Sequence, residues 1–265
     1  MTRSSAPATG SSCGSVARHD GGVRPALIVP VLLAAACGST PDAPVPSATA
    51  ITASASTPAT PTGTATATAA DPVVRRIPDA QWRAMQEVGV VRSGCPATRA
   101  DLRRVEVNFH DWDGDVQRGV LVINRDVAQD VTRIFTDIFD AGFPIRSMKP
   151  IEEFGGDDNA SMAADNTSAY NCRQAGQANS PATFSPHANG RAIDINPREN
   201  PWLDPRCDCF MPTAKNAART PGKGKILEGG PVWRAFTKRG WIWQDIATPD
   251  YQHFDTGYPS VAWKG

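Results

Sequence analysis

The chain of 265 residues has no excess of charge of either sign and no long apolar run. It carries 27 Lys and Arg residues against 27 Asp and Glu residues. A protein that binds nucleic acid ordinarily shows a basic patch or stripe, and none is visible here, so we expect no nucleic-acid partner. The most apolar segment, from Ala26 to Ala36, is interrupted by Pro30. It is well short of the ~20 residues that a membrane-spanning helix needs, so we predict no membrane-spanning helix in this segment.

The same apolar segment has the features of an export signal. Arg18, His19 and Arg24 precede it, and three alanines lead to Cys37. A basic start, a short apolar stretch and small residues before a break indicate a secretory signal. The residues before Cys37 resemble a bacterial lipobox, which implies cleavage there and lipid attachment to the Cys37 thiol. We expect an exported protein of the cell envelope, anchored to the outer face of the membrane; ordinary signal cleavage, giving a free secreted protein, is the alternative.

Composition divides the chain into three parts. Residues 1–37 contain the predicted signal peptide and lipobox, and residues 38–72 consist almost entirely of Ala, Thr, Ser, Pro and Gly. Such a low-complexity stretch has too little apolar surface to offset the entropy of ordering it, so we predict a flexible tether. Residues 73–265 are long enough for one folded domain with a sizeable core. We expect this domain to be a monomer.

Cysteine is scarce in the predicted domain, where only Cys95, Cys172, Cys207 and Cys209 occur. An even set of cysteines in an exported protein predicts disulfides, because the compartment is oxidising. We expect Cys207 and Cys209 to be too close in sequence to pair comfortably with each other. A zinc site at this Cys-x-Cys segment is disfavoured, since it would need two further thiol or imidazole ligands and the flanking residues offer none.

The pattern of apolar and turn-forming residues predicts mixed helices and strands. Helices are expected at 78–88, at 127–139 with Asp126 as the cap, and at 231–239. Strands are expected at 104–109, 119–124, 144–148, 192–196 and 241–243. The acidic residues 110–115 fit a hairpin turn better than a calcium loop, because the distal Glu of such a loop is absent. Without a repeating βαβ order, the fold class is α+β, with a mainly antiparallel sheet flanked by helices.

Histidine is equally scarce, and two of the three histidines in the predicted domain lie in segments rich in other functional residue types. The first segment, residues 185–197, contains His187 in a loop bounded by Pro and Gly, and Asp194 seven residues later. In the predicted strand, the two isoleucines beside Asp194 face one side and Asp194 faces the other. Asp194 would therefore stand on the open face of the sheet, as a rigid metal ligand requires.

The second segment, residues 250–255, contains His253 and Asp250. Two imidazoles and one carboxylate are the ligand set of a catalytic zinc whose fourth position is left for water, so His187, Asp194 and His253 are the predicted ligands of Zn²⁺. A nearby carboxylate would take the proton of the attacking water, and Asp250 is the candidate for this base. Because residues three apart on a straight strand face opposite ways, we expect Asp250 in the turn that precedes the strand.

The spacing Ser-x-His-x-x-Gly-x-Ala-x-Asp, followed downstream by Asp-x-x-His, resembles the motif pair of the VanY-type D-alanyl-D-alanine carboxypeptidases, which are zinc peptidases of peptidoglycan. The motif residues here are Ser185, His187, Gly190, Ala192 and Asp194, then Asp250 and His253. The resemblance covers most of residues 95–254, including 154–173. It implies that His187, Asp194 and His253 bind zinc and that Asp250 is the general base.

The same resemblance implies further roles. Ser185 is expected to contact substrate or to shape the metal loop. An arginine before the first motif holds a substrate carboxylate or stabilises the oxyanion; Arg173 is the first candidate for this role and Arg146 the second. Cys95 and Cys172 occupy places where similar proteins also carry cysteine, so the resemblance pairs them in a disulfide.

These observations predict a zinc-dependent peptidase that hydrolyses the stem peptides of peptidoglycan, most simply as a D-alanyl-D-alanine carboxypeptidase. An endopeptidase of the same family and a non-catalytic module that binds zinc or cell wall are the alternatives. Asp250 argues against the non-catalytic module, because binding zinc alone does not require a base. The segment 203–225, which contains the Cys-x-Cys, departs from the family pattern and is expected to influence specificity if it borders the cleft.

Overall fold

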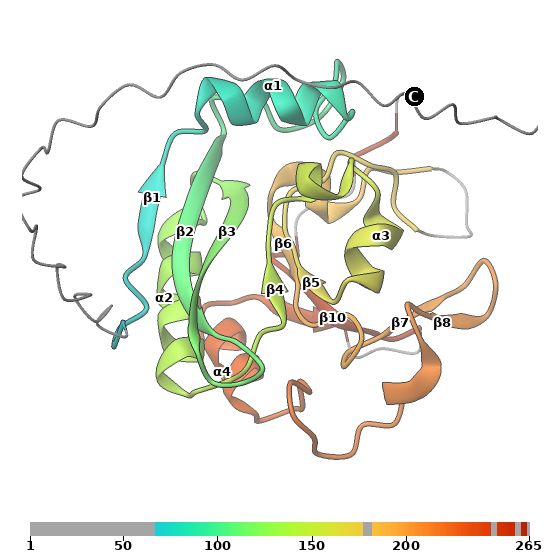
Figure 1. Ribbon diagram of the computed structural model, residues 1–265. Coiled ribbons are helices and arrows are strands. Elements are labelled where there is room, and N and C mark those ends of the chain that lie inside the picture. The colour runs from blue at the N-terminus through green and yellow to red at the C-terminus, as the bar shows by residue number, and fades with distance from the viewer. Residues whose placement is uncertain (1–66, 177–181, 245–247, 258–260, 264–265) are drawn as a thin grey trace, which may run out of the picture. The chain divides into compact units, whose positions relative to one another are not determined.

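The computed structural model describes residues 67–176, 182–244, 248–257 and 261–263 (Figure 1). They comprise most of the predicted domain and the end of the predicted tether. The predicted signal peptide, Cys37 and the rest of the tether lie outside the described residues. Within the described ranges, no helix combines the length and apolar character needed to cross a membrane.

The fold is α+β, as the sequence predicts. The strands are β1 (Val73–Arg75), β2 (Leu102–His110), β3 (Val116–Asn124), β4 (Ser147–Met148), β5 (Asn166–Thr167), β6 (Ala192–Asp194), β7 (Trp202–Asp204), β8 (Cys209–Met211), β9 (Ile242–Gln244) and β10 (Asp250–Asp255). The α-helices are α1 (Asp79–Glu87), α2 (Ala128–Asp140), α3 (Asp158–Ala163) and α4 (Pro231–Thr237). Short 3-10 helices are η1 (Ile151–Phe154), η2 (Pro186–Asn189) and η3 (Ala214–Asn216).

The strands form two antiparallel sheets and one parallel pair. The first sheet has the order β1–β2–β3, and the second has the order β6–β10–β7–β8 with β9 also paired to β10. The parallel pair consists of β4 and β5. The predicted hairpin is confirmed: β2 and β3 pair from Leu102 opposite Asn124 to His110 opposite Val116. Asp111 Oδ1 accepts hydrogen bonds from the backbone N–H groups of two residues that follow it, so the acidic loop is a turn.

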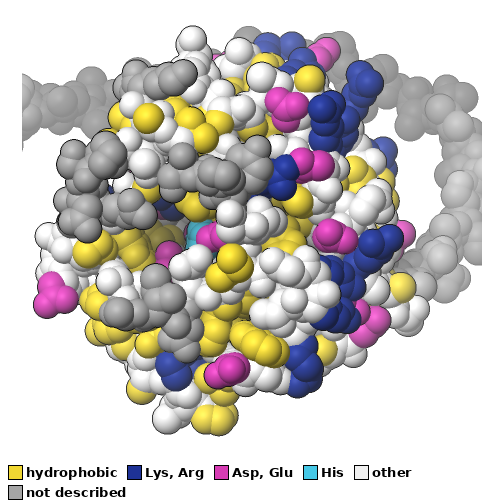
Figure 2. Space-filling model, turned by 180° about the vertical axis from the view of Figure 1, so that it is seen from behind, with side chains coloured by type: hydrophobic (Ala, Val, Ile, Leu, Met, Phe, Trp, Pro, Cys, Tyr) yellow, Lys and Arg dark blue, Asp and Glu magenta, His cyan; other side chains and the backbone are white. Residues whose placement is uncertain are grey.

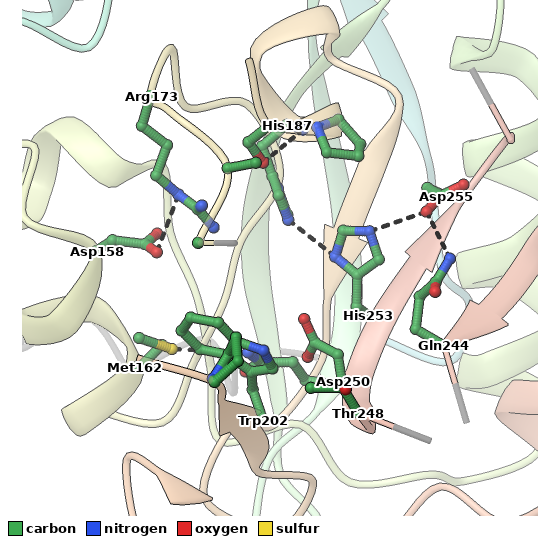
Figure 3. Close-up of a pocket in the computed structure, with 16 residues that line it drawn as sticks. Asp158, Met162, Arg173, His187, Trp202, Gln244, Thr248, Asp250, His253 and Asp255 are labelled. Carbon is green, nitrogen blue, oxygen red and sulfur yellow. Dashed lines mark hydrogen bonds and ion pairs between the residues drawn. The ribbon is translucent and has the colours of Figure 1, made fainter. Parts of the chain in front are cut away.

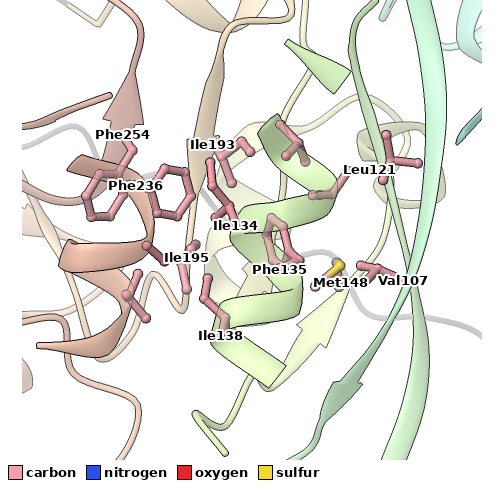
Figure 4. Packing of buried hydrophobic residues seen from close by; sticks show 14 of the residues in the cluster. Val107, Leu121, Ile134, Phe135, Ile138, Met148, Ile193, Ile195, Phe236 and Phe254 are labelled. Atoms are coloured by element: carbon pink, nitrogen blue, oxygen red, sulfur yellow. The ribbon is translucent and has the colours of Figure 1, made fainter. Parts of the chain in front are cut away.

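Helix α2 lies between the two antiparallel sheets and carries most of the main core. Its apolar residues recur at helical spacing, and Ile134, Phe135 and Ile138 are fully buried. In Figure 4, α2 packs on one side against the first sheet and on the other against Ile193 and Ile195, with Phe236 and Phe254 beyond. Both isoleucines thus face the core, as predicted from their alternation with Asp194. The core therefore anchors the back of the strand that carries this aspartate.

The predicted cap of α2 is wrong. Val127 occupies the N-cap position, and no side-chain hydrogen bond from a described residue caps the helix. Asp126 instead forms an ion pair with Arg191, which the chain brings up from the segment between η2 and β6. A charge-assisted bond to a guanidinium competes effectively with a capping bond to a backbone N–H, so the carboxylate turns away from the helix.

The two pairs of cysteines both form disulfides. Cys95 pairs with Cys172, with their Cα atoms 5.9 Å apart, as the resemblance implies. The prediction that Cys207 and Cys209 do not pair is wrong, because they are bonded to each other. Asp208 between them has φ of 52°, and the two Cα atoms lie 5.2 Å apart, within the usual range for a disulfide.

Candidate metal centre and its pocket

The three predicted metal ligands come from two adjacent strands and one short helix. On β6 and β10, Asp194 and His253 are direct partners across the antiparallel pair. His187 lies in η2, where Ser185 is the N-cap and its Oγ accepts a hydrogen bond from the His187 N–H at 3.3 Å. Gly190 ends η2 in the left-handed conformation, with φ of 65°. The absence of a side chain at Gly190 lets the loop that carries His187 pack closely on β3.

The side chains of His187, Asp194 and His253 converge on one point. His187 Nε2 lies 3.2 Å from Asp194 Oδ2, and His253 Nδ1 lies 3.0 Å from Asp194 Oδ1. The two imidazole nitrogens are 3.1 Å apart. One ligand atom from each residue lies within 4.8 Å of the others, and all three residues are buried. Nitrogen, nitrogen and oxygen donors in this arrangement fit one small cation.

A second layer of contacts determines which nitrogen of each imidazole faces the centre. His187 Nδ1 lies 2.5 Å from the backbone carbonyl oxygen of Ala169, which can only accept, so this nitrogen donates and Nε2 faces the centre. His253 Nε2 lies 3.1 Å from Asp255 Oδ2, so Nδ1 faces the centre. Asp255 is held in turn by Gln244 Nε2 at 2.9 Å. A carboxylate or carbonyl behind each imidazole is the usual support of a metal-binding histidine.

The charges around the centre favour a bound cation. Burial alone would raise the pKa of Asp194, but the adjacent imidazoles of His187 and His253 outweigh burial and lower it. Burial alone would lower the pKa of His253, yet hydrogen bonds to Asp194 and Asp255 outweigh burial and raise it. The carboxylates thus stabilise positive charge at this buried point, and a metal ion would supply that charge in place of the proton.

Asp250 stands beside the metal centre but not in the predicted turn. It is the first residue of β10, opposite Trp202 of β7. The register between β10 and β9 shifts between Asp250 and Phe254, and this irregularity lets Asp250 and His253 line the same pocket. Asp250 Oδ1 is buried without a hydrogen-bond partner among the described residues. Burial raises the pKa of Asp250, and the charge of Asp194 adds to the increase, against the opposing charges of His253 and Arg173.

The centre lies in a pocket of about 550 Å³. Figure 3 shows the Arg173 side chain to the left of His187, His253 to the right, and Trp202 below Arg173. Arg173 Nε lies 3.0 Å from Asp158 Oδ2, so its guanidinium is held at the pocket by an ion pair. From the rear, a histidine side chain is visible at the bottom of a hollow beside an acidic side chain (Figure 2). Ser185 also lines the pocket.

Arg146 is not brought to this pocket. Its guanidinium carbon lies 3.9 Å from the centroid of the Trp112 ring, and its Nε lies 3.5 Å from Asp165 Oδ2. The prediction that Arg146 binds substrate therefore has no support from its position. His110 is also elsewhere and stacks on Phe139, with ring centroids 4.3 Å apart.

Several residues of the pocket are not predicted by the sequence, notably Trp202, Gln244 and Asp255. A place near the cleft for Asp158 follows only from the resemblance, which includes residues 154–173. The place of Asp255 beside His253 could have been predicted from the sequence. Asp255 is two residues after His253, and residues two apart on a strand face the same side. Trp202 and Asp158 come from β7 and α3, and no local pattern connects them with the motif residues. The segment 203–225 borders the pocket through Pro205, which meets the condition for an influence on specificity.

A buried set of two imidazoles and a carboxylate, with another carboxylate beside it on an antiparallel sheet, fits the ligands and the base that a metal-dependent hydrolase uses. A family model for D-alanyl-D-alanine carboxypeptidase matches residues 178–256, the segment that contains His187, Asp194, Asp250 and His253. This match confirms the resemblance inferred from the motif pair and indicates a metallopeptidase. No curated protein and no solved structure matches the chain.

Proposed function

We propose that the chain is a zinc-dependent peptidase that hydrolyses peptidoglycan stem peptides as a D-alanyl-D-alanine carboxypeptidase. The observation that carries this proposal is the convergence of His187, Asp194 and His253 within 4.8 Å, with Asp250 lining the same pocket. The family match over the same segment supports the peptidase class and the kind of substrate.

The donor set fits zinc in particular. Two imidazoles and one carboxylate leave a fourth tetrahedral position open, as catalytic zinc sites require. When bound, zinc lowers the pKa of water and polarises the substrate carbonyl. The protein would hold it through His187 Nε2, His253 Nδ1 and Asp194, while Ala169 and Asp255 fix the two imidazole rings from behind.

The neighbouring residues then have distinct roles. Asp250 accepts a proton from the attacking water and delivers it to the leaving amine as the amide C–N bond breaks. Its buried oxygen without a partner among the described residues supports this role, because a substrate or water molecule can satisfy it. Arg173, aligned by Asp158, is proposed to bind a substrate carboxylate, for which the planar guanidinium offers two parallel donors.

Digestion of defined muropeptides tests the function. The purified full chain is incubated with zinc or with a chelator, and the products are identified by mass. Release of a single alanine supports the carboxypeptidase, whereas two larger fragments would support an endopeptidase. If no product depends on the metal for any stem peptide, the chain is not this enzyme, and the non-catalytic binding module becomes the better account.

We further propose that the protein is exported and anchored by lipid at Cys37, on the basis of the sequence before that residue. Labelling of producing cells with a radioactive fatty acid tests the anchor. Label on the wild-type chain and none on a Cys37→Ser variant would support it, and unlabelled wild-type protein in the medium would contradict it.

A further inference from the structure

A second hollow of the domain is lined by four arginines. Its volume is about 810 Å³, within the ~300–1,000 Å³ range of ligand pockets, and among the described residues it shares no lining residue with the metal centre's pocket. The connection from β1 to α1 supplies Arg76, the segment before β2 supplies Arg99, β2 supplies Arg103, and Arg125 follows the end of β3. Asp79 is the single acidic residue among the described residues that line it.

The nearby carboxylates do not neutralise all four guanidinium groups. Arg99 is paired with Asp79 at 2.5 Å, and Arg125 lies 3.7 Å from an oxygen of Asp101. Arg103 donates from Nη1 to two backbone carbonyl oxygens, which carry no net charge to cancel its own. Arg76 is exposed and makes no hydrogen bond or ion pair within the described part of the chain. Two of the four arginines therefore line the hollow without a described carboxylate at ion-pair distance.

Two of the arginines are also held in place by the fold. Arg99 donates to the Ile77 carbonyl oxygen at 2.8 Å and lies over the ring of Trp82, 5.6 Å from its centroid. The two bonds of Arg103 involve Nη1 alone and leave its other N–H groups available. A pre-organised guanidinium loses less conformational entropy when it binds an anion, so this arrangement favours binding.

We propose that this hollow binds phosphate groups of an anionic ligand of the cell envelope. Guanidinium groups match phosphate oxygens with paired hydrogen bonds, and the hollow is larger than one phosphate needs. Figure 2 shows Lys and Arg side chains, with Asp and Glu side chains among them, on the side that carries the β1–β2–β3 sheet, away from the visible histidine. Since β1 is the first strand after the predicted tether, a ligand bound here would hold the domain next to the point where the tether joins it.

Binding of labelled probes tests this site. The full chain carrying Cys37→Ser, which removes lipid attachment, is titrated at low salt with fluorescent polyphosphate, and binding is followed by anisotropy. Arg76→Ala combined with Arg103→Ala should weaken binding about tenfold or more, because both changes remove charged hydrogen-bond donors to phosphate. The matched control is Arg133→Ala combined with Lys149→Ala, which removes two exposed charges elsewhere and should leave the affinity within about twofold.

Two further measurements separate binding at this site from misfolding and from the proposed catalysis. Arg76→Ala alone removes no hydrogen bond or ion pair within the described residues, so weaker binding by this variant could not be attributed to misfolding. Muropeptide cleavage should be unchanged in every variant, because no residue in the described part of the chain lines both the hollow and the metal centre's pocket.

Vesicles of phosphatidylglycerol, with phosphatidylcholine as the neutral control, distinguish a lipid headgroup from a soluble phosphate polymer. Binding to either anionic probe supports a phosphate site, and the probe that binds more tightly identifies the source. Absence of binding to both phosphate probes, equal losses in the two double variants, or equally tight binding of polyglutamate would each overturn the proposal.

Discussion

At the scale of single residues, the metal centre depends on which atoms lie behind its ligands. His187 and His253 present different ring nitrogens to the centre, Nε2 and Nδ1, because Ala169 and Asp255 occupy their other nitrogens. A free imidazole can exchange these tautomers, so the supporting acceptors select the one that binds metal. Asp250 Oδ1 has no hydrogen-bond partner among the described residues and remains available for proton transfer.

Different residues are proposed to bind the zinc ion and to transfer the proton, and this difference gives the first prediction. Asp250→Asn removes the proton acceptor but leaves all three ligands, so zinc should bind normally while kcat falls by about 10²–10⁴-fold. His253→Ala removes a ligand and should lose zinc affinity together with activity. Metal content measured by atomic absorption, alongside muropeptide turnover, separates the two variants. Unchanged turnover in Asp250→Asn would show that another group is the base.

The supporting carboxylate gives the second prediction. Asp255→Ala leaves His253 Nε2 without its acceptor, and we expect zinc affinity to fall about 10–100-fold. Asp255→Asn keeps an oxygen at this place, so its zinc affinity should lie between those of the wild type and the alanine variant. Asp113→Ala, on the exposed hairpin turn, is the control and should bind zinc like the wild type. Competition with a chromophoric chelator measures all four affinities, and an unaffected Asp255→Ala would exclude a positioning role.

At the scale of elements, the site requires η2 to lie directly on the first sheet. The backbone carbonyl of Gly190 accepts a hydrogen bond from the Asn124 N–H at 2.8 Å, at the end of β3. A Cβ atom at Gly190 would meet Asn124 N at 2.8 Å and Leu102 Cδ2 at 2.9 Å. The β2–β3 hairpin thus limits how closely the loop that carries His187 can pack on the first sheet.

The third prediction compares two glycines with similar backbone conformations. Gly190→Ala and Gly142→Ala both place a Cβ at positive φ, 65° and 61°, but only the Cβ at position 190 would have described neighbours within 4 Å. Gly142→Ala should lower the free energy of unfolding by about 1 kcal/mol, and Gly190→Ala by about 2–4 kcal/mol with weaker zinc binding. Urea unfolding of both variants measures this difference. Equal destabilisation would mean that the contact with β3 is not tight.

At the scale of the whole molecule, the sequence predicts those features of the fold and the site that depend on short local patterns of residues. The ligands His187, Asp194 and His253 can be identified because they lie in two short segments whose residue types and spacing match a motif pair, and strand alternation places Asp194 on the open face. Asp158 and Trp202 cannot, because they reach the pocket only through tertiary folding, which brings α3 and β7 to it. The pairing of Cys207 with Cys209 is equally hidden, because the residue between them is left-handed, and a non-glycine residue rarely adopts that conformation.

The two disulfides act over very different lengths of chain, and this contrast gives the last prediction. Cys95–Cys172 spans 77 residues and connects the segment after α1 to the residue just before Arg173. Cys207–Cys209 spans a sequence separation of 2. Since a cross-link stabilises mainly by restricting the unfolded chain, removing the long bridge should lower the free energy of unfolding by about 4 kcal/mol, and removing the short one by only about 1–2 kcal/mol.

Urea unfolding of the paired serine variants, at equal protein concentration and without reductant, measures both losses. Each double variant replaces two cysteines with serines. The variant without the short bridge is therefore a matched control for the effect of the Cys→Ser substitutions themselves. Similar losses in both variants would contradict the argument from loop length. Because the short bridge lies at the end of the β7–β8 hairpin, whose Trp202 lines the pocket, its removal should in addition raise KM for muropeptides, although it lowers the free energy of unfolding less than removal of the long bridge does.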